Sequence, residues 1–225
     1  MGFSKEWETI YQRNEQASIW PWSHLVSLAH RYGNLHEGMR VLELGCGAGA
    51  NIPFFIAQKA DYYGIDGSAT TIARLKERFA GQNVHIAQAD FTQDVHYGGA
   101  FDLIIDRAAV THNSTEDIQR VITLAMNALK PGGRYIGMDW FSTRYEDYAS
   151  VPSEVVDDNT RIFETGDFAG DGRTHFSDET HLRELFAGYR FLFLTEKVEE
   201  QVTPCKHRAA RWDFVVEKTQ EKASS

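Results

Sequence analysis

The stretch VLELGCGAGA, residues 41–50, decides the fold of this chain. A short, largely apolar run leads into three glycines at alternate positions, Gly45, Gly47 and Gly49. Glycine adopts backbone conformations with positive φ and lets the main chain come close to a bound molecule. The stretch therefore predicts a buried strand followed by a tight loop that forms one wall of a ligand site.

Strand and helix patterns alternate on either side of this loop. After about forty residues of helical character, runs rich in β-branched and aromatic residues are each followed by an amphipathic pattern. This alternation predicts an α/β fold, a three-layer sandwich whose mostly parallel sheet has helices on both faces. The expected strands cover residues 40–45, 61–66, 84–90, 101–106 and 134–139, and the expected helices cover residues 52–59, 68–80 and 115–129.

The C-terminal part of the chain has a different pattern. Residues 175–189, HFSDETHLRELFAGY, have the pattern of a capped helix. Residues 190–202 and 210–218 predict two strands joined by a loop. We expect these two strands to form an antiparallel pair at one edge of the sheet.

Composition limits the class of protein. A length of 225 residues, with 42% hydrophobic and 24% charged residues, fits a single globular domain over residues 1–225. No apolar stretch reaches the length of a membrane span and no basic-then-apolar leader is visible, so we expect a cytoplasmic protein. Cys46 and Cys205 form no disulfide or zinc pattern, and a net charge of -9 disfavours binding to nucleic acid.

Carboxylates stand at the ends of four expected strands. Ligands of parallel α/β sheets bind beyond the carboxyl ends of the strands. We therefore expect these side chains to surround one site, although each could instead cap a helix or a turn. They are Asp66, Asp90, Asp106 and Asp139.

The chemistry of these side chains separates two kinds of cofactor. Residues 45–50 can be read as G-x-G-x-x-A, a dinucleotide fingerprint, and Asp66 could accept hydrogen bonds from the ribose of any adenosine cofactor. Glu43 precedes the loop, and Asp90 with Phe91 offers an acceptor for the adenine amine and a ring for its face. So many carboxylates disfavour a pyrophosphate and suit a cationic sulfonium cofactor.

The chain resembles the class I S-adenosylmethionine-dependent methyltransferases. Five stretches carry the resemblance in order: VLELGCGAGANIPFF, YYGIDGSATTI, AQADF, FDLIIDRAAVTH and LKPGGRYIG. The resemblance implies a seven-stranded sheet of order 3-2-1-4-5-7-6 with strand 7 antiparallel, and S-adenosyl-L-methionine as cofactor. The resemblance implies that residues of the first three stretches bind the cofactor, and Glu43 and Asp106 are two further candidates. The full set expected at the cofactor is Glu43, Gly45, Cys46, Gly47, Gly49, Asp66, Gly67, Ser68, Asp90, Phe91 and Asp106.

The segment DRAAVTHNS, residues 106–114, holds the candidates for catalysis. His112 lies where this family has catalytic or substrate-contacting residues, and an imidazole can accept a hydroxyl proton near neutral pH. Asp106 is the second catalytic candidate, and Arg107 is expected at the substrate. Alternatively, residues 112–114 cap the next helix, and Asp106 and Arg107 pair with their neighbours.

Acceptor specificity is expected from three segments. Residues 1–37 form an N-terminal helical lid, unless their aromatic rings simply anchor a helix to the sheet. The connection over about residues 140–177 is long enough to be an acceptor cap. The basic cluster CKHRAARW, residues 205–212, either binds a phosphate or carboxylate of the acceptor or forms a solvated loop. The substrate-binding candidates of these segments are Tyr11, Trp20, Trp140, Arg208 and Arg211.

The expected function is methyl transfer to a small molecule, at a hydroxyl oxygen, such as one of a sugar or surface-glycan precursor. A small-molecule N-methyltransferase of secondary metabolism, a non-catalytic cofactor-binding module and an NAD-dependent oxidoreductase are the alternatives. Asp139 is followed by Trp140 instead of the asparagine that metal-dependent relatives need, so no metal is expected. We expect no nucleic-acid or membrane partner, and a monomer or homodimer.

Overall fold

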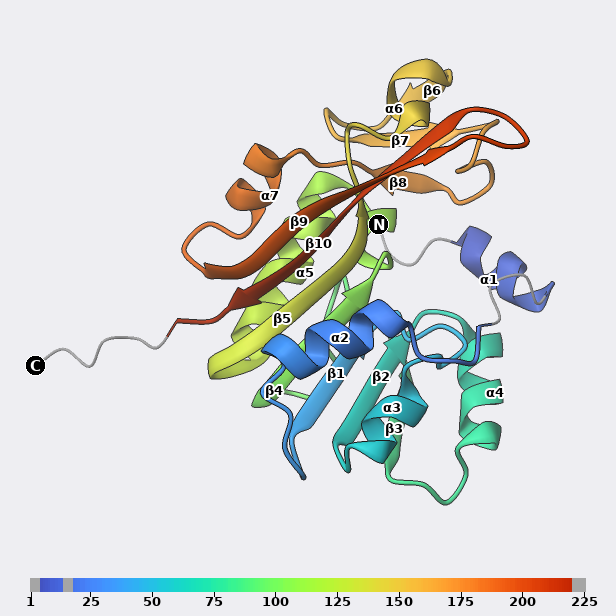
Figure 1. The fold of residues 1–225 in the computed structure, drawn as a ribbon. Coiled ribbons are helices and arrows are strands. Elements are labelled where there is room, and N and C mark those ends of the chain that lie inside the picture. Colours follow the sequence, from blue (N-terminus) through green and yellow to red (C-terminus); the bar gives the residue numbers. More distant parts are fainter. Residues whose placement is uncertain (1–4, 14–17, 220–225) are drawn as a thin grey trace, which may run out of the picture.

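The computed structural model describes residues 5–13 and 18–219. Its main sheet contains β1 (Arg40–Leu44), β2 (Asp61–Asp66), β3 (Val84–Gln88), β4 (Phe101–Arg107), β5 (Leu129–Phe141), β9 (Arg190–Gln201) and β10 (His207–Glu217). The order across the sheet is β3-β2-β1-β4-β5-β10-β9 (Figure 1). Counted within this sheet alone, that order is 3-2-1-4-5-7-6. β10 is antiparallel to both β5 and β9, so the expected edge pair and fold class are confirmed.

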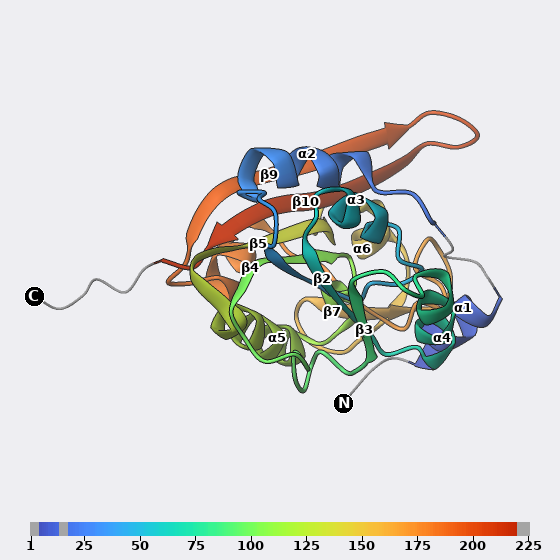
Figure 2. The same ribbon diagram turned by 90° about the horizontal axis from the view of Figure 1, so that it is seen from below.

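Helices cover both faces of the sheet, as expected. Figure 2 shows α2 and α3 on one side of the sheet and α5 on the other. The alternation of side chains along β1 explains this, because Val41 packs in the cluster of the first face and Leu42 in that of the second. The first face carries α2 (Ser23–Tyr32), α3 (Ile52–Ala57) and α4 (Ala69–Arg78), and the second carries α5 (Thr115–Ala128) and α7 (Glu179–Leu185).

The segment after β5 forms a second, smaller sheet that the sequence pattern did not predict. It has the antiparallel order β6-β7-β8 and lies beyond the end of the main sheet (Figure 1). An aromatic cluster of its own holds it to β5: Phe141, Tyr145, Phe163, Phe168 and Phe176. The elements here are α6 (Glu146–Ser150), β6 (Ser153–Val155), β7 (Thr160–Phe163) and β8 (Arg173–His175).

Two further elements border the site. They are α1 (Lys5–Gln12) and the short 3-10 helix η1 (Val110–His112).

The start of one strand differs from the expectation. β5 begins at Leu129 instead of near residue 134, because Leu129 already pairs with Phe101 of β4. The chain then turns at Gly132, whose φ is +78°, and pairing resumes at Arg134. The KPGG stretch therefore belongs to the strand.

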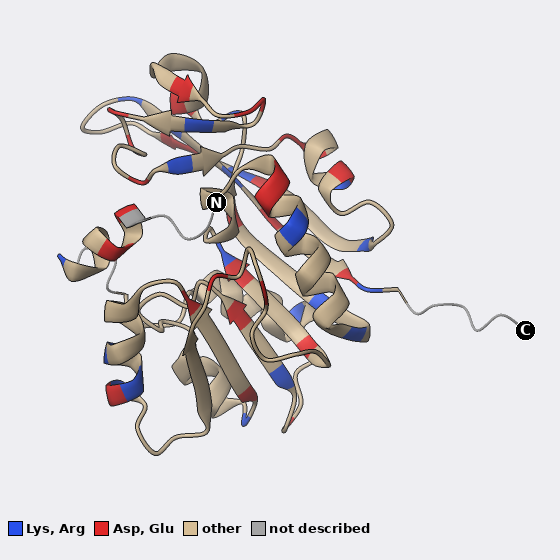
Figure 3. Ribbon diagram, turned by 180° about the vertical axis from the view of Figure 1, so that it is seen from behind, with Lys and Arg blue, Asp and Glu red and all other residues tan. Residues whose placement is uncertain are grey.

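Acidic and basic residues are mixed along the chain. Seen from behind, Lys and Arg are interspersed with Asp and Glu along the ribbon (Figure 3). Within the described residues no helix has both the length and the apolar character needed to cross a membrane.

Candidate functional site

A cavity of about 430 Å³ lies where β1, β4 and β5 end. This volume is within the range of small-molecule sites. Two groups of residues define its walls. The glycine-loop wall consists of Glu43, Gly45, Cys46, Gly47, Gly67, Asp90 and Phe91. The cap wall consists of Phe141, Tyr145, Asp167, Phe168 and Asp171.

Main chain forms most of the glycine-loop wall. The N–H groups of Gly45 and Cys46 both donate to the carbonyl of Ile65, at 2.9 and 3.0 Å, which ties the loop to β2. A Cβ on Gly45 would overlap the methyl group of Ala109, and one on Gly47, whose φ is +50°, would meet the hydroxyl of Tyr11. Only glycine leaves this cradle open to a ligand.

Asp66 braces the loop from the end of β2. Its Oδ2 accepts from the N–H of Gly47 at 3.0 Å, and its Oδ1 accepts from the N–H of Ser68 at 2.9 Å. Burial raises the pKa of Asp66 to about 6. Each carboxylate oxygen can accept a second hydrogen bond, so Asp66 retains capacity for a ligand hydroxyl.

Three cofactor candidates lie behind the cavity surface. Asp66 is 3% exposed and is not among the lining residues. Ser68 is the N-cap of α4, where its Oγ accepts from the N–H of Thr71, and the Cα of Gly49 faces the side chain of Leu75. Ser68 and Gly49 therefore shape the loop from the core side, and their contact with the cofactor stays a prediction.

Glu43 and Asp90 present carboxylates that are already partly engaged. Glu43 accepts from Asn51 Nδ2 at 2.8 Å and from the hydroxyl of Tyr62 at 2.5 Å, and burial raises its pKa to about 7. Asp90 Oδ1 accepts from both the N–H and the hydroxyl of Thr92, at 3.0 and 2.7 Å. Asp90 thus caps its own turn while lining the cavity.

Asp106 organises the turn after β4 and lies outside the cavity. Its Oδ1 accepts from the N–H groups of Ala109 and Val110, and its Oδ2 accepts from Trp140 Nε1 at 2.5 Å. Asp106 is 1% exposed, and burial raises its pKa to about 7. Trp140 is fully buried, because side chains alternate along β5 and only Asp139 and Phe141 face the cavity. Neither Asp106 nor Trp140 is among the residues that line this cavity, and the catalytic role of Asp106 and the substrate contact of Trp140 stay predictions.

His112 lines the cavity with a defined tautomer. Its Nδ1 lies 3.1 Å from the carbonyl oxygen of Arg173, which can only accept, so Nδ1 carries the proton and Nε2 keeps its lone pair. Burial lowers the pKa of His112 to about 4, so the ring is neutral at pH 7. The N-cap of α5 is Ser114, whose Oγ accepts from the N–H of Asp117. The helix cap is thus made by Ser114 and leaves the His112 ring free for the cavity.

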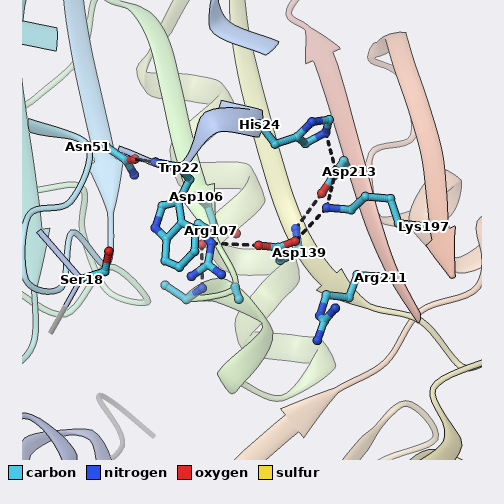
Figure 4. A network of polar contacts seen from close by, with 12 residues as sticks. Ser18, Trp22, His24, Asn51, Asp106, Arg107, Asp139, Lys197, Arg211 and Asp213 are labelled. Carbon is cyan, nitrogen blue, oxygen red and sulfur yellow. Dashed lines mark hydrogen bonds and ion pairs between the residues drawn. The ribbon is translucent and has the colours of Figure 1, made fainter. Parts of the chain in front are cut away.

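Arg107 joins the cavity to a buried ionic network (Figure 4). Its guanidinium carbon lies 3.6 Å from the ring centroid of Trp22, and its Nε lies 2.8 Å from Asp139 Oδ2. Lys197 Nζ bridges Asp139 Oδ1 at 2.9 Å and Asp213 Oδ2 at 2.8 Å. Burial would raise the pKa of Asp139, but Arg107 and Lys197 hold it below its ordinary value.

The remaining substrate candidates divide between the cavity and the surface. Tyr11 and Arg211 line the cavity, whereas Trp20 is 75% exposed and lies outside it. Arg208 pairs with Glu200 at 2.6 Å, away from the cavity. Because Arg208 and Arg211 are three residues apart on β10, they point to opposite faces. Trp20 and Arg208 therefore lie outside this cavity, and their substrate contacts stay predictions.

Several lining residues were not among the candidates. Tyr145 donates to Asp167 Oδ2 at 2.7 Å, and Asp167 also lies 2.9 Å from His207 Nε2. The side chain of Asp171 makes no hydrogen bond or ion pair with any residue in 5–13 or 18–219, and burial raises its pKa to about 6. The sequence signal for these residues was only the length of the segment after β5.

Known proteins match the central part of the chain. Residues 41–133 match the family described as a methyltransferase domain. Phosphoethanolamine N-methyltransferase 1 of Arabidopsis thaliana is 33% identical over 111 residues, 48% of this chain and 22% of that protein. The ubiquinone biosynthesis O-methyltransferase of Sinorhizobium medicae is 28% identical over 99 residues, 43% of this chain and 39% of that protein. The matched stretch thus covers less than half of either relative.

Solved structures share the fold at low identity. A SAM-dependent methyltransferase from Methanosarcina mazei superposes with a TM-score of 0.71 at 16% identity, covering 89% of this chain and all of that one. Phosphoethanolamine N-methyltransferase 2 of Haemonchus contortus has a TM-score of 0.65 at 15% identity, covering 96% of this chain and 57% of that one. Residues 41–133 thus match a methyltransferase domain, and the whole chain has the fold of solved SAM-dependent methyltransferases.

Proposed function

We propose that this chain transfers a methyl group from S-adenosylmethionine, the cofactor of its family, to a hydroxyl oxygen of a small molecule. A sugar hydroxyl is one such acceptor. The observation that carries the proposal is that the glycine loop and the neutral His112 line one cavity of about 430 Å³. The donor and the acceptor would therefore meet beside a group able to take a proton.

The glycine-loop wall fits the cofactor. The open cradle at Gly45 and Gly47 allows close approach of the main chain, and Asp66 behind it would accept from the ribose hydroxyls. Asp90 would accept from the adenine amine, with Phe91 against the base. When bound, the cofactor supplies an electrophilic methyl group on a sulfonium.

The chain itself contributes positioning and one proton acceptor. Proximity and orientation supply much of the rate of such a displacement. The Nδ1–H of His112 is held by the carbonyl of Arg173, which leaves Nε2 to accept the hydroxyl proton. A pKa of about 4 keeps His112 unprotonated at neutral pH, so it is available as an acceptor in nearly every molecule.

We also propose that residues 1–37 act as a lid over the cavity and about residues 140–177 as an acceptor cap, within a single domain over residues 1–225. Residues 1–4 and 14–17 of the proposed lid lie outside the described residues. Trp7 supports the lid role, because its ring lies 4.7 Å from that of His112, and Tyr11 supports it by its position over Gly47. Tyr145 and Phe168 support the cap role by lining the cavity.

A nitrogen acceptor is the second candidate function. Asp171 favours it, since a carboxylate that pairs with no described residue can bind a protonated amine and accept its proton, which leaves the nitrogen lone pair free to take the methyl group. Methyl transfer to a panel of small alcohols and amines, measured as S-adenosylhomocysteine formed, distinguishes the two candidates. Turnover of alcohols supports the oxygen proposal, and turnover of amines alone contradicts it.

Substitution of His112 tests the proton-acceptor role. We expect His112→Ala to lower the methyl-transfer rate on the panel's best acceptor by about 10² to 10⁴, with little change in S-adenosylhomocysteine affinity. Ser114→Ala is the matched control, because it removes the helix cap at a cost of about 1 kcal/mol and should keep the rate. Full activity of His112→Ala would remove the proton-acceptor role and leave cofactor binding untouched.

A further inference from the structure

The terminal nitrogens of Arg107, a residue of the cavity lining, have no bonding partner in the described part of the chain. Arg107 lines the cavity at the end of β4, and its only ion pair in the described part of the chain joins Nε to Asp139. Neither Nη1 nor Nη2 bonds to any residue in 5–13 or 18–219. Two parallel donors on one edge of a planar guanidinium form the fork that carboxylates and phosphates accept.

Neighbouring groups fix this fork before any ligand arrives. The ring of Trp22 lies against the guanidinium at 3.6 Å, and Asp139 holds the Nε edge (Figure 4). Asp139 is anchored in turn, because its N–H donates to Asp213 Oδ1 at 2.9 Å and Lys197 binds both carboxylates. A ligand anion would meet an arginine whose orientation is already determined.

The basic side chains of the cavity lining are Arg107 and Arg211. Within the network, Arg107 and Lys197 match the two carboxylates of Asp139 and Asp213, and His24 Nε2 lies 2.7 Å from Asp213 Oδ2. Arg211 adds a further positive charge to the cavity lining, and its partner Glu199, 3.0 Å away, is 69% exposed and therefore well solvated. Asp171 in the cap wall disfavours an anion beside itself, which leaves the Arg107 side of the cavity for the negative group.

We propose that Arg107 binds an anionic oxygen group, a carboxylate or phosphate, on the methyl acceptor. The inference rests on the proposed function and names its substrate class: a small molecule with a nucleophile for the methyl group and an anionic group for the fork. Arg107 is a specificity-determining residue in this account. Trp22 and Asp139 are positioning residues that act through it.

Calorimetric titration of the full chain, saturated with S-adenosylhomocysteine, tests the fork with inorganic phosphate and with acetate as probes. We expect saturable binding of at least one probe, and the stronger of the two identifies the group that the fork prefers. Arg107→Gln should weaken that binding at least tenfold. Arg107→Lys keeps the charge but loses the two-point geometry, and should weaken it by a smaller factor. Arg208→Gln is the matched control, because Arg208 lies on the face of β10 opposite to Arg211 and outside the cavity. This variant should bind the probes like the wild type.

Three results would overturn the inference. They are no binding of either probe to the wild type, unchanged binding in Arg107→Gln, and a tenfold loss of S-adenosylhomocysteine affinity in Arg107→Gln. The last would assign the fork to the carboxylate of the cofactor. If circular dichroism shows that Arg107→Gln does not fold, Arg107→Lys decides, and wild-type affinity in that variant overturns the inference. Failure of the wild type to bind S-adenosylhomocysteine would instead overturn the proposed function.

Discussion

The glycine-loop wall is built from main chain of one continuous motif and the strand ends beside it, whereas Arg107 and the cap wall depend on side chains from distant segments. Gly45 and Gly47 offer backbone, and Asp66 braces them through an N–H group. Arg107 instead depends on Trp22 before the first strand and on Asp139 at the end of β5. A wall made of main chain accepts one ligand shape. A wall made of side chains can change its ligand specificity through few substitutions.

The two kinds of wall should respond differently to mutation. A side chain added in the glycine loop would overlap its neighbours, and neither the loop backbone nor the neighbouring chain can move to relieve that overlap at low energy. Removal of one partner from the ionic network leaves the other side chain's charge unpaired but partly exposed to water, so the loss of stability is moderate. We therefore expect large effects on cofactor binding from the loop and moderate effects on acceptor binding from the network.

The largest effect is expected for Gly45→Ala. Gly45 has φ +66°, and its Cβ would overlap Ala109, so strain and steric overlap together should destabilise the fold by about 2–5 kcal/mol and lower S-adenosylhomocysteine affinity at least about 100-fold. Gly38→Ala is the matched control, since Gly38 has φ +77° with nothing within 4 Å. It should cost only the strain, about 1 kcal/mol, and keep the affinity. Equal affinity losses in both variants, measured by calorimetry, would contradict the cradle.

The pH dependence of stability should have opposite signs at Glu43 and His112. The folded pKa of Glu43 is raised by burial to about 7, so the folded state binds more protons and wild-type stability relative to Glu43→Gln should fall between pH 4.5 and 7. The folded pKa of His112 is lowered to about 4, so wild-type stability relative to His112→Ala should rise between pH 4 and 6.5. Each change is up to about 3 kcal/mol.

Urea unfolding at a series of pH values measures both differences. Subtracting each variant's free energy of unfolding from that of the wild type removes the contribution of the other titrating groups. Two slopes of the same sign would show that one of these side chains is not buried as described.

A smaller effect is expected for Asp139→Asn. Asparagine tolerates the left-handed backbone of Asp139, φ +54°, so the substitution removes mainly the charge that holds Arg107 and Lys197. Those two side chains are 32% and 34% exposed, so we expect a loss of about 2 kcal/mol, less than for a fully buried pair. The acceptor KM should rise while S-adenosylhomocysteine affinity stays constant.

Glu199→Gln is the control for Asp139→Asn. Glu199 is 69% exposed and pairs with Arg211, so its removal should change stability by less than about 0.5 kcal/mol. A drop in cofactor affinity in Asp139→Asn would show that the network supports both walls, and the contrast between them would then fail.

The resemblance to the methyltransferases implied the sheet order, and contiguous motifs at the strand ends predicted the composition of the glycine-loop wall. Gly45, Gly47 and Phe91 lie in contiguous motifs, and all three are in the lining. Their roles toward the cofactor stay predictions. The alternation of side chains along β5 could be predicted from the sequence, but the face that would line the cavity could not. Trp140 was therefore expected at the cavity, where the structure has Asp139.

The length of residues 140–177 indicated a cap, but sequence patterns did not predict the individual residues of the cap wall or the contacts of Arg107. The stacking of Arg107 on Trp22 joins two segments that no periodicity relates, and Lys197 reaches Asp139 from β9. The strands β6 to β8 are three or four residues long, too short for a two-residue alternation to stand out. Tertiary packing alone determines these contacts.

The most direct test of the account is a calorimetric titration of the wild-type chain with S-adenosylhomocysteine and, separately, with NAD. The cavity described here predicts saturable, one-to-one binding of S-adenosylhomocysteine that Gly45→Ala abolishes, and no binding of NAD. Saturable binding of NAD together with no binding of S-adenosylhomocysteine would contradict it.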